Sequence, residues 1–484
     1  MNPKVDFHAF APELVLAATI VLVLLVDLAS ERGRMLAPRI ATVGVLAAFI
    51  PVITLALDDA DRSMFGGAYV VDNYALALKA FFLAATYITL LLSIDYIHEG
   101  DYYEGEFYFL LLISLFGMSV MASSRDLISI FIALETISIP TYVLATWRKH
   151  DATSNEAGVK YYVFGVLSSA VMLFGMSYVF GTSGSTLLSD IAAFAATDGI
   201  PALFAVGIFF ALAGFAFKVS AVPFHFWAPD TYEGAPTPVT AFLSVASKAG
   251  GFVALLTIVY FGFFPSSDSW QPILWVFAAA TMTLGNLTAL RQTNIIRLLA
   301  YSSIAQGGFI LTALAVAGDG AAQSAFEAVV VYLLIYGAMN LGAFAVVIAA
   351  ARRTHSAEIS SFAGMGTTAP ALAVVMTMFL FSLAGIPPLA GWFAKFVVFR
   401  AVLDAGTPSA IVLGVIAAVN AVIAFFYYAG VAREMWFRVP SGEVNTVKMP
   451  VALGAALALT TAVVIAIGVY PQVFARIGEA AFGG

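Results

Sequence analysis

Apolar stretches of about 20 residues recur along the whole chain, and this is the length that a helix needs to cross about 30 Å of hydrocarbon. Hydrophobic residues make up 61% and charged residues only 11% of the 484 positions, whereas soluble proteins carry about 25% charged residues. The stretches lack the alternating apolar and polar period of membrane β-strands, so helices must satisfy the backbone in lipid. The chain is therefore predicted to be an all-α polytopic membrane protein without a soluble domain.

Apolar windows between polar loops predict about 14 transmembrane helices. Their ranges are 9–29, 38–57, 74–94, 107–123, 126–146, 157–180, 201–222, 237–262, 270–289, 295–316, 325–350, 370–400 with an interruption, 407–431 and 450–473. Asp6 and Glu13 accompany a single Lys4 at the first range, so we expect a spanning helix there and not a cleaved signal peptide.

Basic residues in the predicted loops indicate on which side of the membrane each loop lies. The odd-numbered loops contain Arg32, Arg34, Arg39, Arg148, Lys149, Arg291, Arg297, Arg352, Arg353, Arg433, Arg438 and Lys448. The even-numbered loops and the two tails contain only Lys4, Arg62, Arg125, Arg400 and Arg476. Because cytoplasmic loops are enriched in Lys and Arg, the odd loops are expected to be cytoplasmic, and an even number of helices places both termini on the periplasmic side.

Four ionisable side chains fall well inside predicted helices. Glu135 lies near the middle of helix 5 and Lys248 is deep in helix 8, whereas Lys218 is late in helix 7. Lys395 follows a double proline in helix 12. A charge near the bilayer centre costs about 2.5–3.5 kcal/mol on insertion scales and usually marks a functional site. Structural ion pairs are the alternative, but one acid cannot neutralise three lysines by pairing, which favours a function.

Lysine suits proton transfer because burial disfavours its charged form and can lower its pKa from about 10.4 to about 5–6. Lys160 and His225 are accessory candidates, although each has an ordinary structural explanation as well. Lys79 lies a few residues inside the start of helix 3, so its side chain is expected to snorkel to the membrane surface. Asp230 and Glu233 are expected to be loop and turn residues.

Two of the predicted helices are interrupted in a similar way. The segments "FKVSAVP" (217–223) and "FSLAGIP" (381–387) both run from Phe to Pro, and Trp227 or Trp392 follows within five residues. The prolines at the breaks are Pro223, Pro387 and Pro388. A proline inside a helix kinks or breaks it, and breaks in corresponding places of two halves point to a transport pathway between inverted repeats. Independent kinks without any duplication are the alternative.

The predicted organisation has four segments. Residues 1–106 hold helices 1–3, residues 107–262 a first repeat of five helices (4–8), residues 263–431 an inverted second repeat (9–13), and residues 432–484 helix 14. An odd number of spans per repeat makes the second copy enter the membrane from the opposite side.

Several cofactor classes are excluded for this chain by itself. It contains no cysteine, so it cannot hold an iron–sulfur cluster, a disulfide or a thiolate metal site. Its histidines are scattered and nowhere fall at metal-ligand spacing: His8, His98, His150, His225 and His355. No G-x-G-x-x-G motif and no Walker lysine loop is present. We therefore expect no metal site and no cofactor in this chain.

Four motifs resemble one family of membrane proteins. They are "FIALETISIPTYVLA" (131–145), "KVSAVPFHFWAPDTYEGAPTPVTAFLSVASK" (218–248), "RQTNIIRLLAYSSIAQGG" (291–308) and "GIPPLAGWFAKF" (385–396). The chain is similar there to the antiporter-like membrane subunits of proton-pumping NADH:quinone oxidoreductase, respiratory complex I. Within that family it most resembles the subunit N group, the counterparts of mitochondrial subunit 2, because helix 8 reads "FLSVASKAGG" without the histidine that sister subunits typically place there.

The resemblance implies a proton-translocating subunit without redox centres of its own. Glu135 and Lys218 would be the interacting pair beside the cytoplasmic half, and Lys160 would modulate this pair. Lys248 would be the central carrier and Lys395 the one on the periplasmic exit side. Quinone reduction in neighbouring subunits would push protons along this row.

The resemblance also implies a setting in the bacterial inner membrane. The partners would be the other membrane subunits of complex I, including sister antiporter-like subunits, together with lipids and with protons as the transported species; no nucleic acid is expected. NADH, FMN, iron–sulfur clusters and quinone would belong to other subunits. A subunit of a secondary cation/proton antiporter and a scaffold that does not pump are the competing interpretations.

Overall fold

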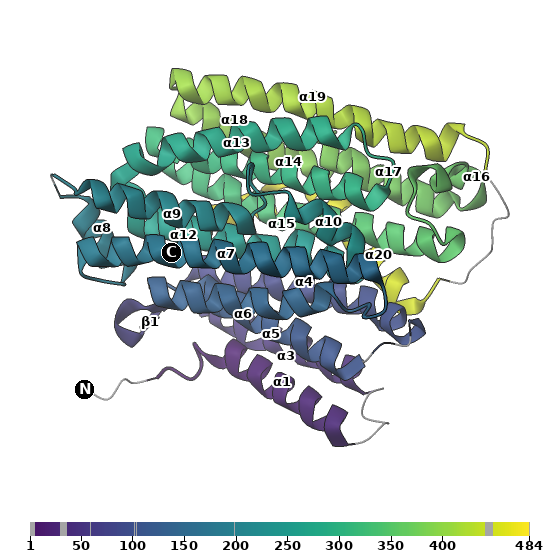
Figure 1. Cartoon of the computed structure of the whole chain (residues 1–484), viewed down its shortest axis with the longest axis horizontal. Helices are drawn as coiled ribbons and strands as arrows, with labels where there is room; N and C mark the ends of the chain where they lie inside the picture. Colours follow the sequence, from purple (N-terminus) through teal and green to yellow (C-terminus); the bar gives the residue numbers. More distant parts are fainter. Residues whose placement is uncertain are drawn as a thin grey trace.

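The computed structural model describes residues 5–29, 36–58, 60–100, 102, 104–197, 199–440 and 449–483. Four basic residues used to assign loops to membrane sides lie outside the described residues: Lys4, Arg32, Arg34 and Lys448. In the described part of the chain, eleven helices are long and apolar enough to cross a membrane. The long helices run along one common direction, so the two ends of the bundle correspond to the two membrane faces (Figure 1).

The predicted spans coincide with helices. These are α1 (Ala11–Ala29), α3 (Ala37–Leu57), α4 (Asn73–Glu99), α5 (Glu104–Ser123), α6 (Leu127–Ala145), α7 (Ala152–Ser183), α9 (Ala202–Lys218), α13 (Ser267–Ala289), α14 (Ile295–Ala315), α15 (Ala322–Thr354), α17 (Pro370–Ala384), α18 (Ala390–Ala405), α19 (Pro408–Phe437) and α20 (Val451–Val469). Span 8 is built from α11 (Thr237–Phe242), the π-helix η2 (Leu243–Ser247), α12 (Lys248–Ile258) and the π-helix η3 (Val259–Phe263). The all-α polytopic fold is thereby confirmed.

Helix ends differ from the predicted ranges where polar residues lengthen a span. α7, predicted for 157–180, begins at Ala152 because the side chain of Asp151 accepts a hydrogen bond from the backbone N–H of Thr153 and caps the helix. Several short elements outside the apolar windows were not predicted. They are the antiparallel strands β1 (Arg62–Met64) and β2 (Tyr69–Val71), and the helices α8 (Leu188–Ala195), α10 (Trp227–Gly234), α16 (Met365–Thr368) and α21 (Gln472–Phe482), with single turns η1 (Phe65–Gly67), η4 (Phe264–Ser266), η5 (Ala317–Asp319) and η6 (Ile359–Phe362).

The two predicted repeats share structural details. α7 has 32 residues and its counterpart α15 has 33. Asp126, which caps α6, pairs through its backbone with Leu187 after α7, and Asn294, which caps α14, pairs with Glu358 after α15. α8 follows the first pairing at the left end of the bundle, and α16 follows the second at the right end (Figure 1). These matched connections lie on opposite faces, as an inverted repeat requires; the boundaries of the four segments stay a prediction.

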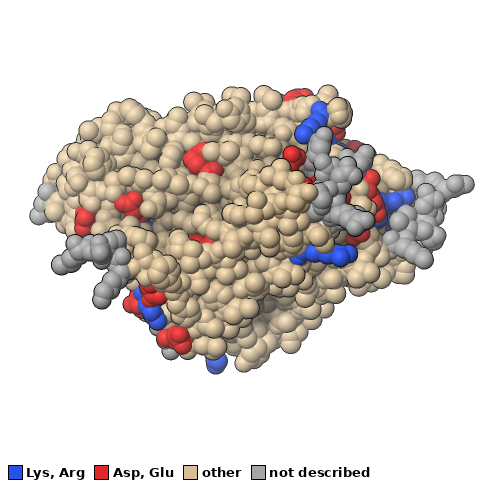
Figure 2. Space-filling model, turned by 90° about the horizontal axis from the view of Figure 1, so that it is seen from below, with Lys and Arg blue, Asp and Glu red and all other residues tan. Residues whose placement is uncertain are grey.

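Helices at the centre of the bundle are buried on all sides, whereas helices at its rim expose apolar side chains. All residues of α11 and α12 are buried, whereas helices at the rim present apolar side chains outwards, such as Val43 of α3 and Val415 of α19, which are 65% and 58% exposed. Figure 2 shows that uncharged residues cover most of one such face, with charged side chains gathered mainly towards its two ends. An apolar belt between two polar rims matches the cross-section of a bilayer.

The expectation for Lys79 is wrong. Its Nζ lies 2.8 Å from a carboxylate oxygen of Glu13, and both side chains are fully buried. Glu13 comes from the first turn of α1 and also accepts a hydrogen bond from Ser119 of α5. The lysine does not snorkel because α1 brings a carboxylate against this face of α4.

Candidate functional site: a buried row of lysines

Lys218 is the last residue of α9, next to the first helix break, and is buried. Its Nζ donates a hydrogen bond of 2.8 Å to Ser138 Oγ and lies 3.4 Å from the hydroxyl of Tyr161. A side chain at Gly251 of α12 would collide with Lys218, because a Cβ there would lie 2.7 Å from its Cγ. The glycine therefore lets α12 approach the amine closely.

The indole of Trp227 stabilises this first break. Its Nε1 donates to the carbonyl of Phe217 in the last turn of α9, and this carbonyl also accepts a hydrogen bond from the backbone N–H of Ser220. The ring of Trp227 also stacks on Tyr161, with centroids 4.5 Å apart. His225 lies in the same break, and its Nδ1 is buried without a hydrogen-bond partner in the described residues. Pro223 lies in the turn between α9 and α10.

Glu135 does not form an ion pair with Lys218 among the described contacts. Its carboxylate accepts a hydrogen bond of 2.5 Å from Ser169 Oγ on α7. Ser138, which binds the lysine, lies one turn further along the same helix, α6. The pair implied by the resemblance is thus bridged by one turn of α6 and is not a direct contact.

Lys248 lies at the centre of the bundle, directly after the π-helix η2, and is buried. Its Nζ donates to the carbonyl oxygen of Ser303 at 3.1 Å and to its hydroxyl at 2.5 Å. Two side chains of α15 bind the wider π-helical turn: Tyr336 donates to the Ser244 carbonyl and Asn340 to the Ser244 hydroxyl. π-Helical turns are rare and frequently occur at functional sites.

Lys395 of α18 is buried against the second helix break. Its Nζ donates a hydrogen bond of 2.6 Å to the carbonyl of Ala384, the last residue of α17, and lies 4.8 Å from the ring centre of Phe309. Gly385 turns the chain with φ of +93°, and a Cβ at this glycine would lie 2.7 Å from Lys395 Cδ. The amine therefore satisfies a carbonyl that the break exposes. Pro387 and Pro388 follow in the turn before α18.

A polar cluster on α14 extends from the partner of Lys248 to the second break. Next to Ser303, the hydroxyl of Ser302 lies 2.5 Å from that of Tyr428. The amide of Gln306, one turn further, donates to Tyr428 at 3.2 Å and to the carbonyl of Leu383 at 2.9 Å. Tyr332 donates to the amide oxygen of Gln306. Leu383 precedes Ala384, the residue that binds Lys395, so the cluster joins the surroundings of the two amines.

No carboxylate among the described residues lies within 4 Å of Lys218, Lys248 or Lys395. Hydroxyl and carbonyl oxygens are their polar partners instead. Structural ion pairs within this chain therefore do not explain the three buried amines.

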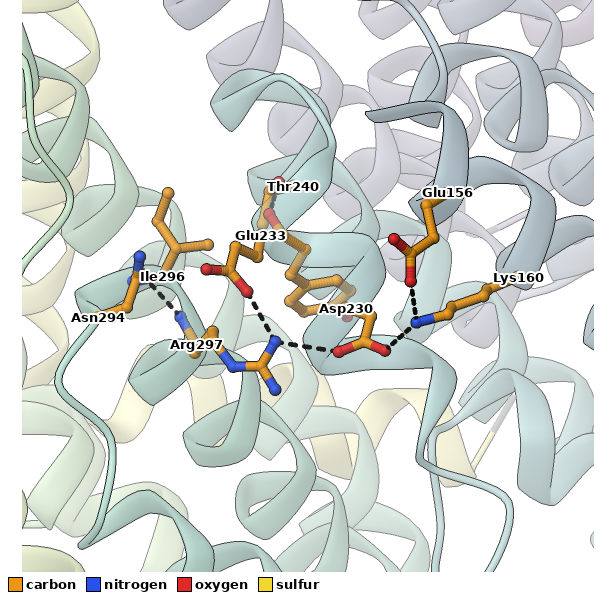
Figure 3. A network of polar contacts seen from close by, with 9 residues as sticks. Glu156, Lys160, Asp230, Glu233, Thr240, Asn294, Ile296 and Arg297 are labelled. Atoms are coloured by element: carbon orange, nitrogen blue, oxygen red, sulfur yellow. Dashed lines mark hydrogen bonds and ion pairs between the residues drawn. The ribbon is translucent and has the colours of Figure 1, made fainter. Parts of the chain in front are cut away.

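Lys160 belongs to a separate ionic network near the first break (Figure 3). Its Nζ lies 2.6 Å from Glu156 and 2.7 Å from Asp230 of α10. Asp230 also binds Arg297 of α14 at 3.0 Å, and Glu233 binds the same arginine at 2.6 Å. Asp230 lies outside the long spans. Burial raises its pKa, but hydrogen bonds from Lys160 and Arg297 outweigh this effect and hold the pKa below its ordinary value.

This network was not predicted from the sequence, since Asp230 and Glu233 lie on a helix and not in a turn. It ties α7 and α10 of the first repeat to α14 of the second (Figure 3). Ser138, Tyr161, Ser303 and Gln306 were not predicted as site residues either. Polar residues within an apolar span, as in "AYSSIAQ", are the sequence signal that could have indicated them.

No group of three or more acidic or histidine side chains in the described ranges could hold a metal ion. The chain also contains no cysteine. The polar groups of the site are amines and a carboxylate, which can bind protons, and hydroxyls and an amide, which can donate and accept hydrogen bonds.

Residues 124–420 match the family described as NADH:quinone oxidoreductase/Mrp antiporter, TM. The chain is 39% identical to NADH-quinone oxidoreductase subunit N of Moorella thermoacetica, and the match covers 96% of each chain. It is 40% identical to subunit N 1 of Rhizobium meliloti, over 89% of this chain and 88% of that protein.

Solved structures agree with these relatives. A chain of respiratory complex I from Thermus thermophilus with bound aureothin superposes with a TM-score of 0.81 at 29% identity, covering 97% of this chain and 99% of that chain. A chain of the Mrp complex from Dietzia sp. has the same fold, with a TM-score of 0.83 at 20% identity over 99% and 97% of the two chains. Because the relatives match nearly end to end, the chain belongs to the subunit N family of NADH:quinone oxidoreductase, whose members are antiporter-like membrane subunits of complex I.

Proposed function

We propose that this chain translocates protons along the row formed by Glu135, Lys218, Lys248 and Lys395. The observation that carries the proposal is the burial of three amines without a carboxylate in ion-pair reach, each with hydroxyl or carbonyl partners. Burial disfavours a charged amine unless an opposite charge compensates it. A small change in the charge or position of a neighbouring group is then sufficient to load or unload such an amine.

The first half of the row would take up the proton. Ser138 and Tyr161, which contact Lys218, have hydroxyls that can accept one proton while donating another. Glu135 lies one turn away from Ser138, so its charge state would bias the protonation of the amine without a direct contact. Lys160 and His225 would be accessory groups near the same break.

The second half would pass the proton from Lys248 towards Lys395. Ser303, Ser302 and Tyr428 supply hydroxyl groups along this direction. Gln306 would act as a positioning residue, because its amide fixes the hydroxyl of Tyr428 and the carbonyl of Leu383 and carries no titratable proton itself.

We also propose the setting that the family suggests. Basic residues in the odd-numbered loops support a cytoplasmic position for these loops, with both termini on the periplasmic side of a bacterial inner membrane. NADH, FMN, iron–sulfur clusters and quinone would be bound by other subunits, and quinone reduction there would drive the row. Sister antiporter-like subunits and lipids would be the neighbours in the membrane.

The test is the number of protons moved per electron by the intact complex in liposomes. Lys248→Met should lower this ratio while electron transfer in the presence of an uncoupler continues, and Lys248→Arg should do the same because arginine does not release its proton. Arg438→Gln, which removes an exposed charge, is the control. An unchanged ratio in assembled Lys248→Met complex would identify a scaffold, and a ratio that follows sodium concentration would identify a cation antiporter; either result overturns the proposal.

A further inference from the structure

A second buried pair of titratable groups lies in the N-terminal helices, outside the row. Glu13 of α1 and Lys79 of α4 are fully buried and 2.8 Å apart. Ser119 of α5 donates to Glu13 Oε1 at 2.7 Å, and Lys79 donates to the hydroxyl of Tyr69 at 2.9 Å. These contacts bring together three helices and the strand β2, beneath the hairpin that β1 and β2 form.

The pair is not fully satisfied by its partners. Glu13 Oε2 is buried without a hydrogen-bond partner among the described residues. A buried carboxylate oxygen that accepts no hydrogen bond is costly when it is charged. Protonation removes this cost and leaves the hydroxyl of Tyr69 as the hydrogen-bond partner of the Lys79 amine. The free oxygen is therefore a position at which an additional proton can bind.

A second ion pair at the same end of the bundle provides a contrast. Asp72 and Arg125 are also buried and 2.8 Å apart. Arg125 additionally donates to the carbonyls of Ala122 and Ser124, and its guanidinium lies 4.4 Å from the ring centre of Phe261. Because arginine stays protonated in proteins, this pair can only be structural, whereas a lysine can give up its proton.

We propose that Glu13 and Lys79 form a second proton-binding site of this chain, in which carboxylate and amine share one proton and the carboxyl group can take up another. On uptake an O–H bond forms at Glu13 Oε2, and on release this bond or an N–H bond of Lys79 breaks; no electron moves. The site goes beyond the proposed row, because no hydrogen bond of the described residues connects it to Lys218, Lys248 or Lys395.

Tyr69 can form a hydrogen bond with the Lys79 amine in both its charged and its neutral state. Its hydroxyl accepts a hydrogen bond from the charged amine and can donate one to the neutral amine. Burial and the nearby charge of Glu13 raise the pKa of Tyr69, so the phenol keeps its proton. Other charged or titratable groups at this end of the bundle include Asp6, His8, Asp58, Asp61, Arg62, Asp72, Arg125, Asp126 and Asp190, and among the described residues none of them is in ion-pair contact with the site.

The test is infrared spectroscopy of the intact complex during a pH titration. We expect a carboxylic-acid band that appears on acidification in the wild type and is lost in Glu13→Gln. Lys79→Arg keeps the ion pair but fixes its cation, so the band should appear only at lower pH. The matched control is Asp72→Asn with Arg125→Met, which removes the structural pair and should leave the band in place.

The outcomes distinguish a proton-binding site from an ion pair that only holds α1 and α4 together. The proposal would be overturned if Glu13→Gln and Lys79→Arg both gave the titration spectra of the wild type. It would also be overturned if only the Asp72 and Arg125 control lost the band. If Glu13→Gln does not assemble, Lys79→Arg still decides the question, because a purely structural ion pair would keep the wild-type titration. This readout does not depend on pumping by the row, so failure of one proposal leaves the other standing.

Discussion

The two helix breaks use their lysines in different ways. In the first break, Lys218 lies before the interruption and donates to side-chain hydroxyls of α6 and α7. In the second break, Lys395 lies after the interruption and donates back to the carbonyl that ends α17. At the first break, backbone N–H groups of the turn donate to the carbonyls of Phe215, Ala216 and Phe217, and the indole of Trp227 adds a second donor to Phe217.

The two interrupted helices therefore use a buried lysine for different purposes. Hydroxyl partners have other partners available and can rotate, so a change at the amine of the first break does not disturb the backbone. The carbonyl bound by Lys395 has no such freedom. Removal of the Lys395 amine would therefore disturb the second break, whereas removal of the Lys218 amine would leave the backbone of the first break satisfied.

The largest effect is expected for Lys395→Met. It leaves the Ala384 carbonyl buried without its amine, at a cost of about 1–3 kcal/mol. It also removes a proposed proton carrier, which should slow proton translocation about a hundredfold or more. Thermal unfolding of the purified complex and proton uptake by liposomes measure the two effects. Lys395→Arg, which can still donate to the carbonyl, should recover the stability and not the translocation. Equal stability of both variants would remove the proposed link to the backbone.

Lys218→Met should slow translocation to a similar extent but change stability by only about 1 kcal/mol or less. Its partners keep other contacts, since Ser138 donates to the Leu134 carbonyl and Tyr161 lies 3.2 Å from Thr141 Oγ1. The same two measurements apply. A loss of stability as large as that of the Lys395 variant would show that the two breaks do not differ as described.

The sequence predicted the framework of this comparison well. Apolar length alone located every span, and the prolines located both breaks, because crossing hydrocarbon and interrupting a helix are local properties of the chain. The burial of Lys218, Lys248 and Lys395 followed from their depth in these spans. Each of these properties depends only on where a residue lies along one helix.

The partners of the charges could not be predicted in the same way. Snorkelling of Lys79 was the reasonable expectation for one helix, but Glu13 approaches from a helix some sixty positions earlier in the sequence. Asp230 was expected to be a loop or turn residue, but it lies on α10, between Lys160 and Arg297. Contacts between helices depend on how the helices are rotated against one another, and an all-round apolar span carries little information about its rotation.

Gln306 allows a direct comparison of the stabilising groups at the two breaks. Gln306→Leu removes the donor to the Leu383 carbonyl and leaves the hydroxyls of Tyr332 and Tyr428 with fewer partners, so we expect a loss of about 2–3 kcal/mol. Trp227→Phe removes one donor to the Phe217 carbonyl, which keeps its hydrogen bond from the Ser220 N–H, and should cost about 0.5–1.5 kcal/mol.

The free energies of unfolding of the two variants show which group stabilises its break more strongly, and proton uptake by liposomes is measured for the same variants. Gln306→Leu should also slow transfer from Lys248 to Lys395, because it loosens the hydroxyl cluster between them, while Trp227→Phe should not affect this second half. The reverse order of stabilities would contradict the assignment of Gln306 as the positioning residue of the second break.

The smallest effect is expected at the ionic network beside the first break. Lys160 and Asp230 have side chains 37% and 36% exposed, and ion pairs at such positions are worth about 0–1 kcal/mol and weaken with salt. Lys160→Met should therefore lower the unfolding temperature only slightly, and less at high salt. Asp230 has a lowered pKa, so the contribution of the network is present above the ordinary carboxyl pKa of about 4 and is lost as the pH falls through the lower folded value. An unfolding series over pH and salt measures both trends, and a large, salt-independent loss in Lys160→Met would show that this network couples the two repeats more tightly than either break does.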